Sequence, residues 1–384
     1  MHSEGPTGAS KGTGNRIGLA LSGGGSRAMA FHLGCLRALN ELSLLDRISA
    51  LSTISGGSVI GAYYAYTPNL SFPQFEADVR SLLKQGFHRG IAAALFSPAN
   101  FVRCLSNYCA TTADSAVSRL LGKEPALIRY PSRVDMFHKV LETKAFPGLK
   151  MSSPRRRDMD VVVGACDLRT GSAFRFGNTK SGGWRYGEMV EWDVHVAFAV
   201  AASAAYPILL PPFDRKWRFN TVDGEIERRV LITDGGIYDN LGIQVLEPGR
   251  DPSKSIHVLP CDFIIACNAG HGQDSGDGVP LNFLPRVARS FEIVHRRVQD
   301  SAMHRLHHLS EARIIKGFAL PYLGQQDAAL PFRPSTFTSR SEVLSYPTDF
   351  AAMSDTWIEK LSGRGEQLTK ILVAEYLGEL IAKP

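Results

Sequence analysis

Residues 51–60 read LSTISGGSVI, and this stretch is the strongest indication of how the chain folds. It ends a β-prone run, ISALSTI at 48–54, and it opens a segment, 56–66, that is apolar nearly all round. Such an order predicts a strand, a sharp turn and a helix buried at the centre of a domain. Ser55 lies at the turn, where it is either the nucleophile of an enzyme or only a residue that caps the helix.

The local pattern departs from the usual motif of a nucleophilic serine. That motif reads G-x-S-x-G, but Thr53 stands at the first glycine position of this chain. Glycine there mainly lets the strand and the helix pack closely, so a small threonine is compatible with a slight displacement. Gly56 and Gly57 do follow the serine, although Ser58 is equally suited to cap a helix. The stretch alone leaves both interpretations open.

A second strand-turn-helix unit comes earlier in the chain. Residues 17–21, IGLAL, are β-prone, and the turn that follows contains Gly23, Gly24, Gly25 and Ser26 before a helical pattern begins. Consecutive glycines allow positive φ angles, so successive N–H groups can point into one space at a helix N-terminus and bind a phosphate or an oxyanion. Two such units in succession predict a parallel sheet that is covered by helices on both faces.

The same glycine turn also admits two other interpretations. Gly23, Gly25 and Ala28 match the dinucleotide pattern G-x-G-x-x-A, but that fold needs an acidic residue near the end of the second strand, which here ends in Ser52 and Thr53. A Walker loop is excluded because no G-K-[ST] follows. A nucleotide-dependent enzyme is therefore the least favoured hypothesis, and a glycine turn without any ligand is the bland alternative.

A third candidate for chemistry is Asp234, in TDGGIYDN at 233–240. It follows a predicted strand, 228–233, and is itself followed by Gly235 and Gly236. Asp-Gly-Gly after a strand is a common turn, so the motif by itself is more often structural. However, the carboxyl ends of parallel strands share one crevice. We therefore expect the glycine turn, Ser55 and Asp234 to meet there.

The rest of the chain is expected to form one large domain. The 384 residues are 44% hydrophobic and 21% charged, which suffices for a sizeable core. Residues 1–16 are small, polar and glycine-rich, so they predict a disordered leader without a signal peptide. A helical insertion is expected at about 67–150, and a C-terminal helical part at about 280–384, ending in two helices over 349–380. Further strands are predicted at 158–168, 174–177 and 261–270, with a helix at 194–206.

Composition limits the partners and the cofactors. The net charge of +6 favours anionic partners, but it is too small to choose between phospholipid surfaces and nucleic acid. The six cysteines form no C-x-x-C and no Cys/His cluster at metal spacing, which indicates reduced core thiols in an intracellular protein and no metal or other cofactor. Residues 194–213 carry no formal charge, but three prolines in their second half favour a buried helix over a membrane span.

Five ordered blocks resemble the patatin-like phospholipases and the related cytosolic phospholipases. The resemblance covers 17–242 and, more weakly, the segment through YPTDF to the C-terminal helices. The departures from the family pattern are Thr53 at the elbow, the absence of a glycine after Arg27, and Gly236 where some members have alanine. The blocks are LSGGGSRAMAFHLG at 21–34, STISGGS at 52–58, CDLRTG at 166–171, ASAAYPILLPP at 202–212 and TDGGIYDN at 233–240.

This resemblance implies a fold and a two-residue site. The fold is a three-layer α/β sandwich with a central, mostly parallel sheet and a helical insertion. Ser55 is the implied nucleophile and Asp234 the base that contacts it directly, forming an acyl-enzyme that water then hydrolyses. Arg27 either anchors the glycine loop through an ion pair or faces a lipid phosphate. The implied oxyanion hole comprises Gly23, Gly24, Gly25 and Ser26, and Gly56, Gly57, Gly235 and Gly236 support the site.

The implied function is a lipid acyl hydrolase of the phospholipase A or lysophospholipase type. Its substrate is a phospholipid or another acyl lipid, so the protein is expected to be cytoplasmic with peripheral contact to a membrane, and to bind no nucleic acid. Residues 91–102 and 208–213 are candidates for an interfacial surface or acyl channel, with core packing as the alternative. The other possibilities are an acyltransferase or thioesterase using the same site, or a catalytically silent lipid-binding regulator.

Overall fold

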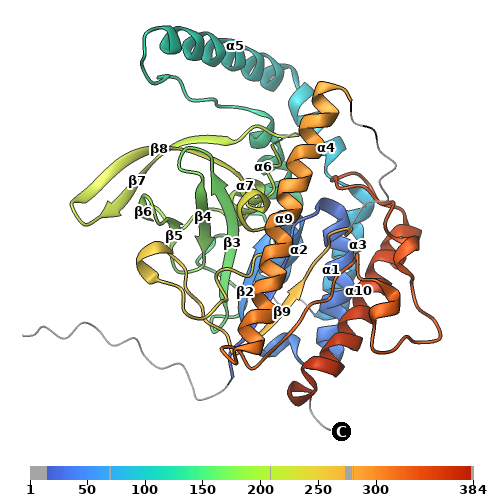
Figure 1. The fold of residues 1–384 in the computed structure, drawn as a ribbon. Coiled ribbons are helices and arrows are strands. Elements are labelled where there is room, and N and C mark those ends of the chain that lie inside the picture. The colour runs from blue at the N-terminus through green and yellow to red at the C-terminus, as the bar shows by residue number, and fades with distance from the viewer. Residues whose placement is uncertain (1–14, 69–70, 208, 273–278, 280, 382–384) are drawn as a thin grey trace, which may run out of the picture.

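The structure is a computed structural model that describes residues 15–68, 71–207, 209–272, 279 and 281–381 (Figure 1). Residues 1–14 of the predicted leader lie outside the described residues. Arg16, the last residue of that leader, belongs to the fold instead. Its backbone N–H donates to the Asp262 carboxylate (2.8 Å), and its guanidinium forms an ion pair with Asp160 (2.8 Å).

Within these described residues, a ten-stranded sheet organises the fold, in the order β10-β9-β1-β2-β3-β4-β5-β6-β7-β8. Its first half is parallel and consists of β10 (Gly317–Ala319), β9 (Phe263–Cys267), β1 (Ile17–Leu21), β2 (Ile48–Ile54) and β3 (Asp160–Asp167). Its second half is antiparallel and consists of β4 (Ser172–Gly177), β5 (Ser181–Gly183), β6 (Gly187–Met189), β7 (Phe213–Thr221) and β8 (Gly224–Asp234). Because β8 also pairs with β3, this half closes on itself like a barrel.

The predicted mostly parallel sheet is therefore wrong for half of the strands. Residues 168–171 connect β3 to β4, and such a short turn cannot make the crossover of a dozen or more residues that parallel neighbours require. The strand β4 must return antiparallel, and Figure 1 shows this half curling away from the parallel half. The closure matters for the site because it pairs Asp234 with Ala165 on the central strand β3.

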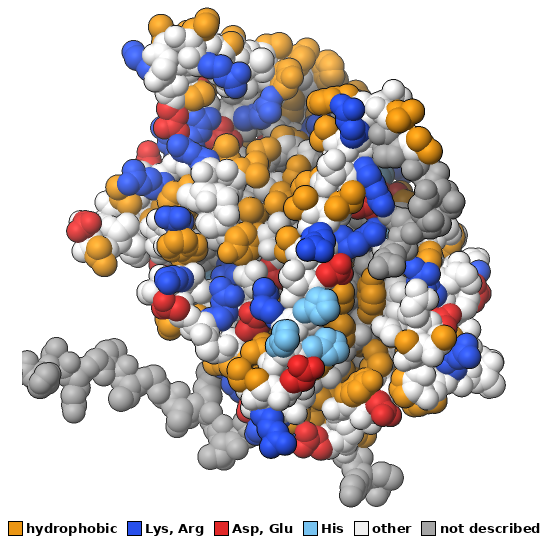
Figure 2. Space-filling view, viewed as in Figure 1, with side chains coloured by type: hydrophobic (Ala, Val, Ile, Leu, Met, Phe, Trp, Pro, Cys, Tyr) orange, Lys and Arg blue, Asp and Glu red, His pale blue; other side chains and the backbone are white. Residues whose placement is uncertain are grey.

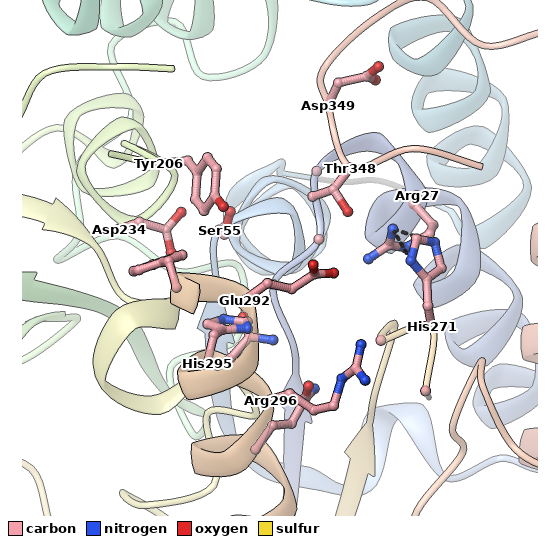
Figure 3. Close-up of a pocket in the computed structure, with 18 of the residues that line it drawn as sticks. Arg27, Ser55, Tyr206, Asp234, His271, Glu292, His295, Arg296, Thr348 and Asp349 are labelled. Carbon is pink, nitrogen blue, oxygen red and sulfur yellow. Dashed lines mark hydrogen bonds between the residues drawn. The ribbon is translucent and has the colours of Figure 1, made fainter. Parts of the chain in front are cut away.

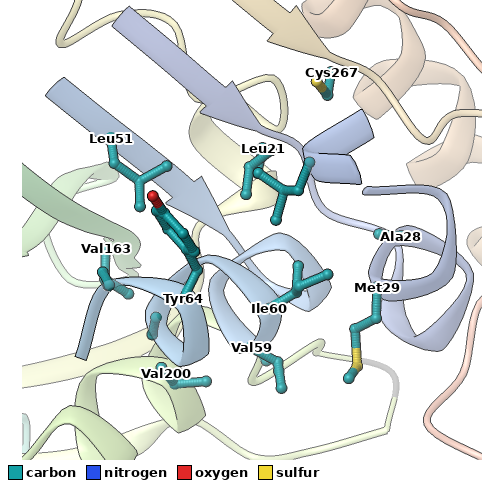
Figure 4. Packing of buried hydrophobic residues seen from close by; sticks show 14 of the residues in the cluster. Leu21, Ala28, Met29, Leu51, Val59, Ile60, Tyr64, Val163, Val200 and Cys267 are labelled. Atoms are coloured by element: carbon teal, nitrogen blue, oxygen red, sulfur yellow. The ribbon is translucent and has the colours of Figure 1, made fainter. Parts of the chain in front are cut away.

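Helices cover both faces of the parallel half. Leu19, Leu21 and Leu51 face one side and join the larger core with α1 (Gly25–Glu41) and α2 (Gly56–Tyr66), as Figure 4 shows for part of this packing. Ala20, Ala50 and Val162 face the other side and pack in a second cluster with Ala302 and Leu306 of α9 (Phe283–Glu311). This alternation along each strand is what a sheet buried on both faces produces.

The predicted insertion is helical and consists of α3 (Phe72–Gln85), α4 (His88–Phe96), α5 (Pro98–Leu120) and α6 (Arg133–Lys144). The helix α5 extends away from the rest of the molecule in Figure 1, and most of its side chains are exposed. The helix expected at 194–206 is α7 (Val196–Ser203) and is shorter than predicted. Within the described ranges, no helix combines the length and the apolar character that crossing a membrane would need.

Residues 349–380, all of which the structure describes, contain one long helix, α10 (Asp355–Tyr376), followed by a 3-10 turn at Gly378–Leu380, so the prediction of two helices there is wrong. The helix α10 continues through Gly365, where it packs closely against α1. Glycine is needed at this position because a Cβ would lie 2.1 Å from the Phe31 carbonyl oxygen of α1. The predicted turn after β8 contains a short helix, α8 (Gly236–Asp239). Further 3-10 turns lie at Leu45–Arg47, Pro252–Lys254, Asp327–Ala329 and Arg340–Glu342.

Candidate active site

The three predicted motifs converge on one cavity. The strands β1 and β2 are parallel neighbours with Leu21 opposite Thr53, so the glycine loop and the serine turn leave the sheet at the same edge. Asp234 ends β8 beside β3 and faces the same space. The cavity measures about 800 Å³ and is lined by Gly24, Ser55 and Asp234, among others. In Figure 3, Ser55 and Asp234 lie on one side of it, and Arg27 with His271 on the other.

Ser55 occupies a strained turn between β2 and α2. Its φ is 51° and its ψ is −120°, a backbone conformation that residues other than glycine rarely adopt and that costs roughly 1–3 kcal/mol. The backbone N–H of Ser55 donates to the Ser203 hydroxyl (2.9 Å), which helps to hold the turn. Glycine is required directly after the serine because a Cβ on Gly56 would lie 2.2 Å from the Gly25 carbonyl oxygen. The glycine loop and the serine turn are thus in backbone contact.

The threonine that departs from the usual elbow motif has a structural explanation. Thr53 is completely buried, and its methyl group points at α2. The facing residue on α2 is Gly61, where a Cβ would lie only 2.5 Å from Thr53 Cγ2. In the usual motif the strand carries the glycine that allows close packing. Here the helix carries it, at Gly61, so the strand and the helix still pack closely.

Two of the four predicted oxyanion donors are already used within the fold. The Gly23 N–H donates to the Asn240 carbonyl oxygen (3.1 Å), and the Ser26 N–H donates to the Asp349 carbonyl oxygen (2.6 Å). For Gly24 (φ 142°) and Gly25 (φ 59°), the described part of the chain offers no acceptor to the backbone N–H. The predicted loop of four donors is corrected to these two residues, at the first turn of α1.

Arg27 anchors the glycine loop, but its acceptors differ from the expected ion pair. Its guanidinium donates to the carbonyl oxygens of Ala269 (3.0 Å) and Tyr346 (3.4 Å) and contacts the ring of His271. Burial lowers the pKa of Arg27 to about 10, and the nearby carboxylates of Glu292 and Asp349 oppose this shift. Arg27 also lines the cavity, so the alternative role of facing a lipid phosphate stays a prediction.

Asp234 is a buried aspartate whose carboxylate binds a proton more readily than an ordinary aspartate does. Its side chain is buried, and its Oδ1 accepts a hydrogen bond from the Gly236 N–H (2.6 Å). Burial raises the pKa of Asp234 to about 7, while the hydrogen bond from Gly236 and the neighbouring Ser55 side chain oppose the rise. Burial therefore has the larger effect on this pKa. Gly235 must be glycine because a Cβ would lie 2.3 Å from the Gly164 carbonyl oxygen.

The C-terminal end of α7 positions both residues of the pair, which the sequence did not reveal. The Ser203 hydroxyl accepts from the Ser55 N–H and donates to the Gly164 carbonyl oxygen, so the neighbouring Ser58 hydroxyl (2.9 Å) must donate to Ser203. The backbone N–H of Asp234 donates to the carbonyl oxygen of Ala205 (3.2 Å). The only available signal was the block ASAAYPILLPP, in which this serine is an unremarkable small residue.

The helix α9 forms a wall of the cavity rather than only a solvated basic face. Glu292, His295, Arg296 and Gln299 line the cavity at helical spacing. Burial lowers the pKa of His295, which favours the neutral ring at neutral pH. Across the described part of the lining, the histidines are His295 and His271.

The fold and the site define an α/β protein with a serine on a strained strand-to-helix turn, a buried aspartate and a glycine loop at one edge of the sheet. Residues 19–246 match the family model described as patatin-like phospholipase. This match covers more than half of the chain. The chain therefore belongs to the patatin-like phospholipase family.

Comparisons with individual proteins agree with this fold. Human GIVD cytosolic phospholipase A2 superimposes with a TM-score of 0.52 and 12% identity, covering 96% of this chain and 62% of that chain. The same enzyme in complex with methyl gamma-linolenyl fluorophosphonate and terbium chloride gives 0.51 and 12%, covering 96% and 59%. The patatin-like phospholipase domain-containing protein ZK370.4 of Caenorhabditis elegans is 49% identical over 57 residues, which are 15% of this chain and 4% of that protein.

These relatives are longer than this chain. The chain spans about three fifths of the human enzyme and a small fraction of the nematode protein. At 12% identity, the structural likeness establishes the fold alone.

The inference that Gly61 makes room for the methyl group of Thr53 can be tested by a double-mutant cycle. Gly61→Ala should lower the free energy of unfolding by roughly 1–3 kcal/mol, because its Cβ overlaps the threonine methyl group. Thr53→Gly should also destabilise, through a small cavity. The double variant, which restores the usual motif, should recover a large part of both losses, as measured by urea unfolding. Strictly additive losses would contradict the compensation.

Proposed function

We propose that the protein is a lipid acyl hydrolase that cleaves carboxylic esters of phospholipids or other acyl lipids with Ser55 and Asp234. The observation that carries this proposal is the pairing of a serine in a strained turn with a buried carboxylate whose pKa is raised to about 7. A carboxylate with an ordinary pKa would be a poor acceptor for a serine proton at neutral pH. The membership in the patatin-like phospholipase family supports lipids as the substrate class.

In the proposed first step, the Ser55 hydroxyl attacks the ester carbonyl carbon while its proton passes to the Asp234 carboxylate. The tetrahedral intermediate collapses, and the protonated Asp234 returns the proton to the departing alcohol. This step leaves the acyl group on Ser55 and the carboxylate ionised again. Water then attacks the acyl-enzyme, giving its proton to Asp234, and the fatty acid leaves as Ser55 regains a proton.

The backbone N–H groups of Gly24 and Gly25 are the proposed oxyanion hole. They lie at the first turn of α1, where the N–H groups of a helix lack intrahelical acceptors and carry a partial positive charge. The contact between Gly56 and Gly25 keeps them beside the serine turn. One such donor typically contributes roughly 3–4 kcal/mol to the stabilisation of the transition state.

We further propose that lipid reaches the cavity from a membrane at the N-terminal end of α9. Leu281 and Phe283 are 78% and 67% exposed there, and Val287 on the next turn is 48% exposed. The helices α4 and α5 also carry exposed apolar side chains, among them Phe96. Both helices lie at the same end of the molecule as the start of α9, at the top of Figure 1, and Figure 2 shows hydrophobic side chains gathered at this end. The basic residue Arg286 lies between the apolar ones, as suits an anionic surface. The helix leads from this end directly to Glu292 in the cavity wall.

The dyad is tested with a fluorophosphonate probe, the class of inhibitor bound by the human relative. Ser55→Ala should abolish both labelling and the release of fatty acid from vesicles, because no nucleophile remains. Asp234→Asn should lower kcat by roughly 10²–10⁴-fold, because the base is lost. An exposed serine on α9 provides the matched control, and Ser301→Ala should leave both readouts unchanged.

Three outcomes of this experiment would redirect the proposal. Continued release of fatty acid by Ser55→Ala would exclude this serine as the nucleophile. Labelling of the native protein without release of free fatty acid would favour acyl transfer to another acceptor, which analysis of the lipid products would identify. A native protein that binds vesicles but never reacts with the probe would be a silent lipid-binding protein.

The raised pKa of Asp234 predicts opposite effects of pH on activity and stability. Because the base must be ionised, kcat/KM should fall about tenfold per pH unit below about 7. The folded state binds this proton more tightly than the unfolded state, so the contribution of Asp234 to stability decreases as the pH rises from about 4 to about 7. Asp234→Asn should therefore have a higher Tm than the native protein at pH 8, and the difference should vanish near pH 4. If the variant and the native protein had the same Tm at pH 8 as well as at pH 4, burial of the ionised carboxylate would not be destabilising.

The proposed membrane surface predicts a loss of vesicle binding without a loss of chemistry. Replacing both Leu281 and Phe283 with serine should weaken binding to phosphatidylserine-containing vesicles at least tenfold, because two large apolar side chains no longer enter the lipid. Turnover of a water-soluble short-chain ester should not change. Val222, which is fully exposed at the tip of the β7–β8 turn, serves as the control, and Val222→Ser should bind as the native protein does. Equal losses in both variants would place the membrane contact elsewhere.

A further inference from the structure

Three potential metal ligands meet in the core next to the glycine loop. His32 and Cys35 lie three residues apart on α1, and Cys267 is the last residue of β9. All three side chains are completely buried, and their ligating atoms all lie within 4.8 Å of one another. They take no part in the proposed ester chemistry.

The ring of His32 is held with one nitrogen aimed into this cluster. Its Nε2 lies 2.9 Å from the Ser22 carbonyl oxygen, and because a carbonyl can only accept, Nε2 carries the proton. The lone pair of the ring is therefore on Nδ1. Among the described residues, Nδ1 has no hydrogen-bond partner although it is buried. A buried polar atom without a partner destabilises the fold and calls for an explanation such as an ion.

This arrangement is the one that a metal-binding histidine adopts. Such a histidine binds the metal through one nitrogen and donates its other N–H to a carboxylate or a backbone carbonyl, which fixes the orientation of the ring. Here the Ser22 carbonyl oxygen takes that second role. The other two ligands are thiols, and the Cys35 thiol lies 3.6 Å from the Gly365 carbonyl oxygen, to which it donates weakly.

We propose that Nδ1 of His32 and the Sγ atoms of Cys35 and Cys267 bind a Zn²⁺ ion. Thiolate and imidazole ligands suit zinc, whereas magnesium and calcium prefer oxygen ligands. Binding releases the two thiol protons, and two thiolates with one Zn²⁺ have no net charge, which suits a buried site. Zinc bonds of about 2.0–2.3 Å require the three side chains to draw together slightly from their present spacing.

The site would stabilise the segment that carries the oxyanion donors. Ser22 immediately precedes the glycine loop, and its N–H donates to the carbonyl oxygen of Cys267 (3.1 Å). Its own carbonyl oxygen accepts from His32, and its hydroxyl accepts from the Ala269 N–H (2.8 Å). Two of the three ligands thus bond directly to the residue from which the glycine loop begins. A bound zinc ion would fix α1 to β9 at this point.

The test uses the full chain with its two more accessible thiols removed by Cys104→Ala and Cys109→Ala, so that they cannot bind metal. After treatment with a chelator, this protein should bind one equivalent of Zn²⁺ in a competitive titration. Its Tm should rise by about 3 °C at a hundredfold excess of free zinc over Kd. Co²⁺ in place of zinc should produce a thiolate-to-cobalt charge-transfer band in the near ultraviolet.

Variants in the same background assign the ligands. Cys35→Ala and the nearly isosteric Cys267→Ser should each weaken zinc binding at least tenfold and reduce the charge-transfer band. Cys166→Ala removes a buried cysteine outside the cluster and should bind zinc as the parent protein does.

Three results would overturn the proposal. They are the absence of stoichiometric zinc binding and of the cobalt band in the folded parent protein, zinc binding that survives in both ligand variants, and a Cys35–Cys267 disulfide in the protein purified without reductant. The cobalt spectrum of the parent protein needs no ligand variant, so the proposal can be refuted even if a variant fails to fold. Because the readouts are metal binding and Tm, they are independent of whether Ser55 proves to be the nucleophile.

Discussion

The contact between the serine turn and the glycine loop is the constraint on which the rest of the site depends. Parallel pairing of β1 and β2 brings the two turns to one edge of the sheet, and the absence of a side chain on Gly56 lets the backbone of one turn touch that of the other at Gly25. The positive φ of Ser55 is maintained by this contact and by the Ser203 hydroxyl. A strained residue persists only where its surroundings determine its conformation. The position of the hydroxyl and that of the oxyanion donors are therefore set together.

The second half of the site depends on how the sheet closes. Because β8 pairs with the central strand β3, Asp234 lies in the interior beside Ser55 instead of at a solvent-exposed strand end. That burial raises the pKa of Asp234 to about 7, and the same burial makes the ionised carboxylate unfavourable for the folded state. The raised pKa that the proposed base requires is thus obtained at the expense of stability. The short helix α7 offsets part of this by bonding to the backbone of both residues of the pair.

Local patterns in the sequence were sufficient to locate the strands β1 and β2, the helix α2 and both residues of the proposed dyad, because each depends on a continuous run of residues. The use of individual N–H groups was not predictable, since Gly23 and Ser26 donate to carbonyl oxygens of Asn240 and Asp349 far along the chain. Of the antiparallel half, β4 and β8 were predicted in part, at 174–177 and 228–233, but β5, β6 and β7 were missed. The strands β5 and β6 have three residues each, and β7 is largely polar, so neither hydrophobic periodicity nor length marks them.

The same limit explains the buried cluster of His32, Cys35 and Cys267. The spacing of His32 and Cys35 is that of one helical face, but two ligands three residues apart are common by chance. The third ligand joins them only because β9 pairs with β1, the strand that leads into α1. The pairing of β9 with β1 thus has two effects near the glycine loop. It places the Cys267 side chain against α1, and it lets the Cys267 carbonyl oxygen accept a hydrogen bond from the Ser22 N–H. The cluster is therefore linked to the proposed oxyanion donors through two peptide units.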